Sequence, residues 1–460
     1  MGLDFRIKDF AYPISIIRLK NQFERNQWIS EDALRAYQQK RLRLIIEHAY
    51  RNVPYYRRIF QEKNIIPSDI KSINELKIMP FLTKEIIQKK FNELIAVNAK
   101  KYKPRLLSTS GTSGGAVKFY VDKPSNILEF VYYWRFWGWA GYRLGNTFAE
   151  LSAQSFTPYS QKKEQYYYFE FFTRRLMVNS LLISYKNSDN YIRLFKKFKP
   201  RFLKGLPSNL YALARIIGKK TGHGITFRAI FSQGENLLRY QRDYIENTFS
   251  CKVFDSYGHM ERTVAISQCP FDSYHVHMDY GGVEFVEPVS VKSEDGIADG
   301  QIREVVGTSL YNFAMPLIRY RTGDYIRLKP TAQKCSCNRT FPIVGSIVGR
   351  NSDIVITPDG RAITALYVVF DRTPNICFGQ VIQERLDKLL VKVAYNSQDI
   401  DSSDALLLKN LVDFVGDSMK IEIVHIGPEE LEMNKLVKNK TIISKISSEQ
   451  VIRQEKLCVV

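Results

Sequence analysis

An unbroken run of serine, threonine and glycine, from Ser108 to Gly115, is the feature that most constrains how this chain can fold. Strand-like stretches flank the run, Pro104–Leu107 before it and Lys118–Val121 after it. Glycines let backbone amides approach an anion closely, and the hydroxyl groups supply further donors. We therefore predict a phosphate-binding loop between two strands, with a positive charge added by Lys118; its members are Ser110, Gly111, Thr112, Ser113 and Gly114. The alternative is a flexible linker, and a Walker loop is excluded because its Gly-x-x-x-x-Gly-Lys spacing cannot be placed here.

Helical and strand-like segments alternate along much of the chain. Apolar residues at helical spacing predict a helix over 33–51, a second helical stretch over 72–94 that Pro80 interrupts, and a buried aromatic helix over 127–140. Strand-like runs follow at 202–205, 229–232, 252–255, 282–286 and 301–306. Because 460 residues exceed the size of a single core, we expect at least two domains. The pattern predicts an α/β fold with sizeable sheets, then a polar break at Gly349–Asp353 and a small α+β domain.

The chain is strongly basic, with 67 Lys and Arg against 47 Asp and Glu and a formal charge of +20. Such a charge attracts nucleotides, coenzyme A, nucleic acid or an anionic membrane face. We find no helix-turn-helix, zinc-finger or aromatic RNA-binding signature, so we favour a solvated basic surface over a nucleic-acid site. Neither a signal peptide nor an apolar run of about 18 residues occurs, which predicts a cytoplasmic protein that could associate peripherally with the membrane face.

A second motif, Asp255–Glu261, combines a strand end with a carboxylate. Gly258 allows a close approach, and Tyr257 offers a flat face on which a base can stack. Glu261 follows at what we predict to be a helix start, where a carboxylate can hold Mg²⁺ against phosphate oxygens. The alternative is an ordinary turn from strand to helix.

Two further polar segments lie near the end of the chain. In Tyr320–Asp324, we expect a tight glycine turn to present Asp324 to the two hydroxyls of a ribose, although alone this is only a turn signal. Arg350 follows Gly349 at the polar break, and the basic segment Met433–Lys440 lies far downstream. A mobile domain could bring one of its lysines to a transferring phosphate, and the alternative is a solvated charged tail.

Taken in this order, the motifs resemble the adenylate-forming superfamily of acyl-CoA synthetases, and most of all its phenylacetate–CoA ligase branch, including relatives found with capsular polysaccharide biosynthesis. Further similarity lies in Ile45–Arg57, Met79–Lys84, Lys204–Ser208 and Ser232–Glu235, so the resemblance covers nearly the whole chain. It implies a large N-terminal domain, 1–348, with mixed sheets that bind ATP and the acyl group, and a small mobile C-terminal domain, 349–460.

The resemblance also implies roles for individual residues. The loop from Ser110 to Gly114 would hold the ATP phosphates, and Glu261 would bind Mg²⁺. Gly234, Glu235 and Tyr257 would line the adenine and acyl pocket, Asp324 would bind the ribose, and Arg350 would sit at the hinge. Lys438, or alternatively Lys435, would stabilise the adenylation transition state. The sequence departs from the family at Val437, Met260 and Ser352, which puts the second half-reaction in doubt more than ATP binding.

The cysteines suggest a metal site. Cys335 and Cys337 form a tight Cys-x-Cys pair, and Cys269 is followed by His275. Thiolates with one imidazole suit a closed tetrahedral Zn²⁺ site. Some members of the branch show a similar set, which implies a structural zinc here. His277 could replace His275 because both point to the same side of a strand. The alternative is a set of free thiols.

The resemblance implies a two-step reaction. A carboxylic acid attacks the α-phosphate of ATP to give an acyl-adenylate, and the acyl group then passes to coenzyme A, a carrier-protein thiol or an amine. The identity of the acid stays open, because the aromatic residues of 127–140 are as readily explained by a core as by a pocket. A non-catalytic nucleotide-binding protein of the same fold, or a nucleic-acid binder, are the competing classes.

Overall fold

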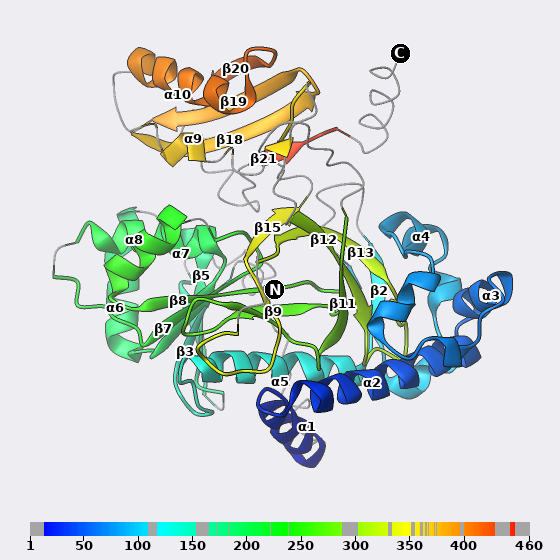
Figure 1. Ribbon diagram of the computed structural model, residues 1–460. Coiled ribbons are helices and arrows are strands. Elements are labelled where there is room, and N and C mark those ends of the chain that lie inside the picture. Colours follow the sequence, from blue (N-terminus) through cyan, green and yellow to red (C-terminus); the bar gives the residue numbers. More distant parts are fainter. Residues whose placement is uncertain are drawn as a thin grey trace. The chain divides into compact units, whose positions relative to one another are not determined.

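The computed structural model divides the chain into two compact units (Figure 1): Met1–Val286, Glu304–Thr322 and Ile326–Ile347 form the first, and Glu287–Arg303, Gly323–Tyr325 and Val348–Val460 form the second. The structure describes residues 13–108, 117–152, 165–171, 173–183, 185–220, 222–237, 239–287, 302–329, 334–350, 355–358, 362–363, 366, 368–371, 373, 375–395, 400–427 and 442–446. Among these residues, no helix combines the length and the apolar character that a membrane span requires.

The first unit begins with helices, as the sequence predicts. They are α1 (Pro13–Asn26), α2 (Glu31–Asn52), α3 (Pro54–Glu62) and the short α4 (Lys84–Lys89). Ser30 caps α2 by accepting a hydrogen bond from the Ala33 amide at 3.3 Å, and Pro54 begins α3 where its missing amide costs nothing. The helical stretch expected over 72–94 is interrupted at Pro80, as predicted, and divides into a 3₁₀ turn at Ile73–Ile78, then α4, then a second 3₁₀ turn at Asn92–Leu94. Pro80 and the Thr83 cap separate these pieces.

A nine-stranded sheet forms the centre of the first unit, in the order β14-β10-β9-β8-β7-β6-β3-β5-β4. Its inner strands, β3, β5, β6, β7 and β8, pair in parallel, whereas β4, β9, β10 and β14 pair antiparallel at the two sides. The strand bounds are β3 Phe148–Ser152, β4 Tyr167–Glu170, β5 Arg175–Asn179, β6 Phe202–Gly205, β7 Ala229–Gln233, β8 Lys252–Gly258, β9 Ala265–Gln268, β10 Tyr274–Val276 and β14 Ile343–Val344.

Helices cover both faces of this sheet. Phe202, Phe231 and Phe254 pack into the same core as the aromatic helix α5 (Lys123–Trp139). Their strand neighbours Leu203, Ile230 and Val253 belong instead to a second core with the remaining helices, α6 (Ser188–Phe198), α7 (Pro207–Gly218) and α8 (Arg239–Phe249). Side chains alternate across a strand, so two cores on one set of strands mean a helix–sheet–helix sandwich. This confirms the predicted α/β class.

The alternation of strands and helices expected along much of the chain stops after β8. The strands that follow, β9 to β15, join two sheets, and the structure describes no helix between them. Four of them, β11 (Gly281–Val286), β12 (Ile302–Ser309), β13 (Tyr320–Arg327) and β15 (Ser346–Arg350), form a separate sheet in the order β11-β12-β13-β15. A smaller hairpin pairs β1 (Arg105–Ser108) with β2 (Lys118–Val121), both at the predicted positions.

The second unit has its own sheet and its own core. The sheet has the order β20-β19-β18-β21, from β18 (Ile376–Arg385), β19 (Lys388–Tyr395), β20 (Lys420–His425) and β21 (Ile442–Ser444). Val391 of β19 packs with Leu407 and Leu411 of α10 (Ile400–Val415). The short helix α9 (Val368–Asp371) and the hairpin of β16 (Val355–Ile356) and β17 (Ala362–Ile363) complete its described elements.

Candidate active site and candidate metal centre

Three parallel strands of the central sheet end side by side. Gly205 at the end of β6 pairs with Ser232 of β7, and Gln233 at the end of β7 pairs with Ser256 of β8. The predicted site residues Gly234, Glu235 and Gly258 therefore gather at one edge of the sheet. In open α/β sheets, ligands bind in the crevice outside the carboxyl ends of the strands. The three segments thus meet where this fold class binds its ligands.

The connections after β6 and β7 contact one another closely. Gly234 has a φ of +83°, and a Cβ at this position would lie 3.0 Å from Cδ2 of Leu206. Glycine is favoured here because the positive backbone angle strains any other residue, and an added Cβ would also press on the Leu206 side chain. The carboxylate of Glu235 accepts a hydrogen bond from the Ser208 amide at 3.1 Å, at the start of α7. This contact fixes the two connections relative to each other.

Glu261 lies in the connection between β8 and β9, not at the start of a helix as we expected. Gly258 pairs with Ala265 across the two antiparallel strands, so the chain must turn back at once, and Arg262 takes a φ of +55° to close the turn. Glu261 is buried. Its Oε2 lies 3.0 Å from Nδ1 of His259, and its Oε1 accepts a hydrogen bond from the Tyr320 hydroxyl at 2.8 Å.

These contacts keep Glu261 ionised. Burial alone would raise its pKa, but the hydrogen bond and charge of His259 and the hydrogen bond of Tyr320 outweigh burial and lower the pKa to about 2. A carboxylate offers about four lone-pair positions, and the contacts with His259 and Tyr320 occupy only two of them, which leaves room for a cation. The predicted magnesium ligand is thus a charged carboxylate at working pH.

The Glu261 connection is also joined to two other predicted segments. Tyr320 is the first residue of β13, the strand that carries Asp324. On the other side, Nη1 of Arg262 donates a hydrogen bond to Oδ1 of Asn126 at 2.8 Å, in the first turns of α5. Helix α5 follows β2 directly, so the strand after the predicted phosphate loop leads into this contact. The sequence did not predict that His259 and Tyr320 contact the Glu261 carboxylate, although His259 stands two positions before Glu261 within the same motif.

Asp324 is buried within β13, and the tight glycine turn that we predicted before it is wrong. Residues Tyr320–Arg327 form one strand, in which Gly323 has a φ of +72°. A glycine with positive φ produces a local irregularity in a strand without ending it.

The remaining predicted residues are only partly described. Lys118 is exposed and pairs with Ser108 across the β1–β2 hairpin. The loop residues Ser110, Gly111, Thr112, Ser113 and Gly114, and the lysines Lys435 and Lys438, lie outside the described residues. Tyr257 is half-buried in β8, and Arg350 ends β15.

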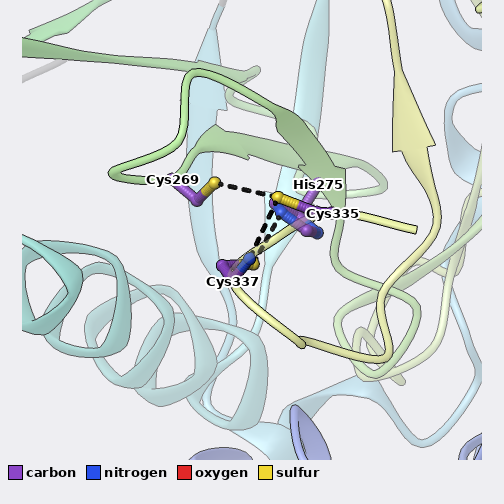
Figure 2. Close-up of side chains that lie close together, drawn as sticks. All are labelled: Cys269, His275, Cys335 and Cys337. Carbon is purple, nitrogen blue, oxygen red and sulfur yellow. Dashed lines mark hydrogen bonds between the residues drawn. The ribbon is translucent and has the colours of Figure 1, made fainter. Parts of the chain in front are cut away.

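The structure brings Cys269, His275, Cys335 and Cys337 together in the first unit (Figure 2). One possible ligand atom from each lies within 4.8 Å of the others, and all four residues are buried. The Sγ atoms of Cys269 and Cys335 are 3.5 Å apart, and Sγ of Cys337 is 3.3 Å from Nε2 of His275. Zinc–sulfur bonds of about 2.3 Å at tetrahedral corners place sulfur atoms about 3.8 Å apart, so the spacing fits such an ion.

Strand pairing assembles this cluster from distant segments. Cys269 follows β9 and begins the turn into β10, and its amide donates a hydrogen bond to the Ser273 carbonyl at 2.9 Å. His275 of β10 pairs with Ile343 of β14, which draws the segment of Cys335 and Cys337 to the hairpin. Asn338 takes a φ of +58° and donates its amide to the Cys335 carbonyl, which closes the turn between the two cysteines.

His275 is oriented as a metal ligand. Its Nδ1 lies 3.1 Å from the carbonyl oxygen of Phe341, so Nδ1 carries the proton and Nε2 faces the cysteines. Burial lowers the pKa of His275 to about 4, which keeps the imidazole neutral. His277, our alternative ligand, has a different partner: its Nδ1 accepts a hydrogen bond from Arg135, which forms a buried bidentate pair with Asp279 at 2.7 and 2.9 Å.

No protein-family model matches the chain. It is 28% identical over 349 residues to the phenylacetate-coenzyme A ligase of Pseudomonas putida, covering 71% of this chain and 73% of that protein. It is 25% identical over 451 residues to the phenylacetate-coenzyme A ligase of Aromatoleum evansii, covering 90% and 95% of the two chains. It is also 24% identical to the protein CapK of Staphylococcus aureus over 376 residues, or 80% of each.

Among solved structures, the chain is similar to a 2-hydroxyisobutyryl-CoA ligase in the postadenylation state, with a TM-score of 0.68 and 17% identity over 95% of this chain and 94% of that one. At this identity the likeness concerns the fold. Together, the sequence relatives and this fold confirm the resemblance that the motifs indicated.

Proposed function

We propose that this adenylate-forming ligase, which resembles the phenylacetate–CoA ligases along most of its length, uses ATP to activate a carboxylic acid and transfers the acyl group to coenzyme A. One observation carries the proposal: Glu261, a buried carboxylate with a lowered pKa, lies at the carboxyl edge of the sheet and is bound to β13 through Tyr320. This placement of Glu261 supports the assignment of phosphate chemistry to this edge of the sheet.

In the first step, a carboxylate oxygen of the acid forms a bond to the α-phosphorus of ATP, and the bond from that phosphorus to pyrophosphate breaks. Glu261 would hold Mg²⁺, which neutralises phosphate charge when bound. The Ser110–Gly114 loop would hold the phosphates, Asp324 the ribose, and Gly234, Glu235 and Tyr257 the adenine and the acyl group. Positioning and charge neutralisation supply most of the catalysis in such chemistry.

In the second step, we propose that the C-terminal unit turns at Arg350 and that coenzyme A takes the acyl group and releases AMP. Because the motifs also resemble relatives found with capsular polysaccharide biosynthesis, and the chain is similar to CapK, we further propose a role in surface polysaccharide biosynthesis, in which a carrier-protein thiol or a sugar amine would be the acceptor instead. Lys438, with Lys435 as the alternative, would stabilise the first transition state.

The test is ATP–pyrophosphate exchange with a panel of aromatic, aliphatic and hydroxylated acids. We expect exchange with at least one class of acid, and a sharp loss of rate with unchanged ATP affinity in Lys438→Ala. The same loss in Lys435→Ala would transfer the role to that residue. ATP binding without exchange for any acid would favour a non-catalytic nucleotide-binding protein, a class that the departures at Val437, Met260 and Ser352 motivate.

We further propose that the cluster of Cys269, His275, Cys335 and Cys337 holds a structural Zn²⁺. Four buried donors within 4.8 Å of one another, with a neutral imidazole already oriented by Phe341, support a closed site. A closed site has no position for substrate, so its role would be to join the β9–β10 hairpin to the segment before β14. Metal analysis of the purified protein tests this directly.

A further inference from the structure

Helix α2 carries two kinds of exposed surface. In its first turns, Arg35 pairs with Glu31 one turn away, and acidic and basic side chains balance. Toward its end, Lys40, Arg43 and Arg51 are exposed, at helical spacings that place them on one face. Glu47 is the only acidic residue between Lys40 and Arg57 in the sequence. The second half of the helix therefore presents a positive face to solvent.

Neighbouring segments extend this positive face beyond the helix. The Arg57 side chain donates hydrogen bonds to the carbonyls of Tyr50 and Arg51 at the end of α2. The amide of Val97 donates to the Asn52 carbonyl at 2.8 Å, which brings the 97–103 segment alongside. Tyr102 packs edge-on against the ring of His48, with 5.6 Å between ring centroids.

Lys100 and Lys101 come to the same place through these contacts. Both are exposed, and they belong to the 3₁₀ turn Ala99–Tyr102. Burial lowers the pKa of His48, and the charge of Lys101 lowers it further, which places that lysine within electrostatic range of the end of α2. We call Lys40, Arg43, Arg51, Arg57, Lys100 and Lys101 the basic patch; α2 and α3 lie within the blue part of Figure 1.

The charges of the basic patch are not balanced within the described part of the chain, where none of the six forms an ion pair. Arg58, the next residue after Arg57, shows the contrast: it pairs with Glu93 and Glu62. Six unpaired cations against Glu47 create a local field that attracts an extended anion.

Two exposed aliphatic side chains lie in the same region. Leu44 is 43% exposed on the basic face of α2, and Val97 is 76% exposed beside its end. A soluble polyanion such as nucleic acid would bind the cations, but it would not bury the protruding aliphatic side chains. An anionic bilayer takes both, because lipid phosphates attract the cations while aliphatic side chains enter the boundary between headgroups and acyl chains.

We propose that the basic patch, with Leu44 and Val97, docks the protein on an anionic lipid surface. This inference does not depend on the adenylation reaction. Anionic lipid headgroups would then be the binding partner of some of the basic residues that give the chain its net charge of +20.

The test is co-sedimentation of the full chain with vesicles of phosphatidylcholine, alone or mixed with phosphatidylglycerol, at low and high salt. We expect binding only to the anionic vesicles, weakened by salt. Lys100→Ser with Lys101→Ser should reduce partitioning about thirtyfold at low salt. Val97→Ser should weaken binding without changing the salt dependence. The matched control, Lys196→Ser with Lys197→Ser, removes the same charge from exposed positions on α6 and should leave partitioning unchanged.

Three results would overturn the proposal. The first is no binding to anionic vesicles. The second is an equal loss in the patch and control variants, which would mean that net charge alone is responsible. The third is a loss on charge removal with no effect of Val97→Ser, which would assign the patch to a soluble polyanion such as duplex DNA. Pyrophosphate exchange, measured in parallel, should be the same in all variants, so failure of this proposal is distinguishable from failure of the enzymatic one.

Discussion

The connections at the two ends of strand β9 hold polar clusters of opposite character. The Glu261 cluster precedes this strand, and the Cys269 cluster follows it, about 13 Å away for a strand of four residues. In the cysteine cluster, the donor atoms face one another and can satisfy a single ion completely. In the Glu261 cluster, His259 and Tyr320 keep one carboxylate charged and leave part of its lone-pair capacity available. Strand β9 thus separates the proposed closed metal site from the proposed magnesium and substrate site.

The comparison predicts that the two clusters fail in different ways. Loss of a ligand from the cysteine cluster should destabilise the fold, because the binding energy of a structural metal is folding energy. Loss of the Glu261 carboxylate should slow the reaction while the fold persists.

The largest effect is expected for Cys337→Ser. Removal of one of four ligands should abolish stoichiometric zinc and lower the free energy of unfolding by about 4 kcal/mol, as loss of a metal site does. Thermal denaturation and metal analysis measure this. The matched control is Cys251→Ser, since Cys251 is a half-buried free cysteine outside the cluster and should change both quantities little. Equal stability in the two variants would remove the structural role of the cluster.

The acid stability of the Glu261 cluster is the next largest effect. The pKa of Glu261 falls from its ordinary value of 4.5 to about 2 in the folded protein. A lowered carboxyl pKa contributes stability above pH 4.5, and this stability is lost as the pH falls toward 2. Glu261→Gln should therefore lose up to about 3 kcal/mol of pH-dependent stability in that window. Urea unfolding of both proteins between pH 2 and pH 6 measures it, and parallel pH profiles would contradict the assignment.

A smaller effect is expected for Tyr320→Phe. The substitution removes a hydrogen bond to a charged group, worth about 1.5–3 kcal/mol, and should raise the pKa of Glu261 and slow exchange about tenfold. Tyr132→Phe is the matched control, because its buried hydroxyl contacts the neutral Ser267 hydroxyl at the same distance of 2.8 Å. We expect about 1 kcal/mol of stability loss and no change in exchange for that variant. If the two variants slow exchange equally, Tyr320 has no special role.

The sequence was sufficient where local chemistry decides structure. Hydrophobic spacing predicted α2 and α5, and the flanks of the serine–glycine run predicted β1 and β2. The set of Cys269, His275, Cys335 and Cys337 was predicted from ligand chemistry, and the structure brings them together. The choice between His275 and His277 needed the structure, because both were expected on one side of a strand and only their distant partners, Cys337 for His275 and Arg135 for His277, distinguish them.

The sequence was insufficient where distant partners decide structure. Glu261 was expected at a helix start, but β9 pairs back on β8 and forces a turn. Asp324 was expected after a tight turn, but pairing within a sheet keeps Gly323 inside β13. Tyr320 stands 59 positions from Glu261, and no local pattern reveals their hydrogen bond.

The most direct measurement is ATP–pyrophosphate exchange of Glu261→Gln, with an acid that the wild-type protein activates, over a range of Mg²⁺ concentrations. The account predicts a rate about 10²–10³-fold lower, with weaker apparent Mg²⁺ affinity and a fold that is intact at neutral pH. Exchange at the wild-type rate, with the wild-type dependence on Mg²⁺, would contradict it.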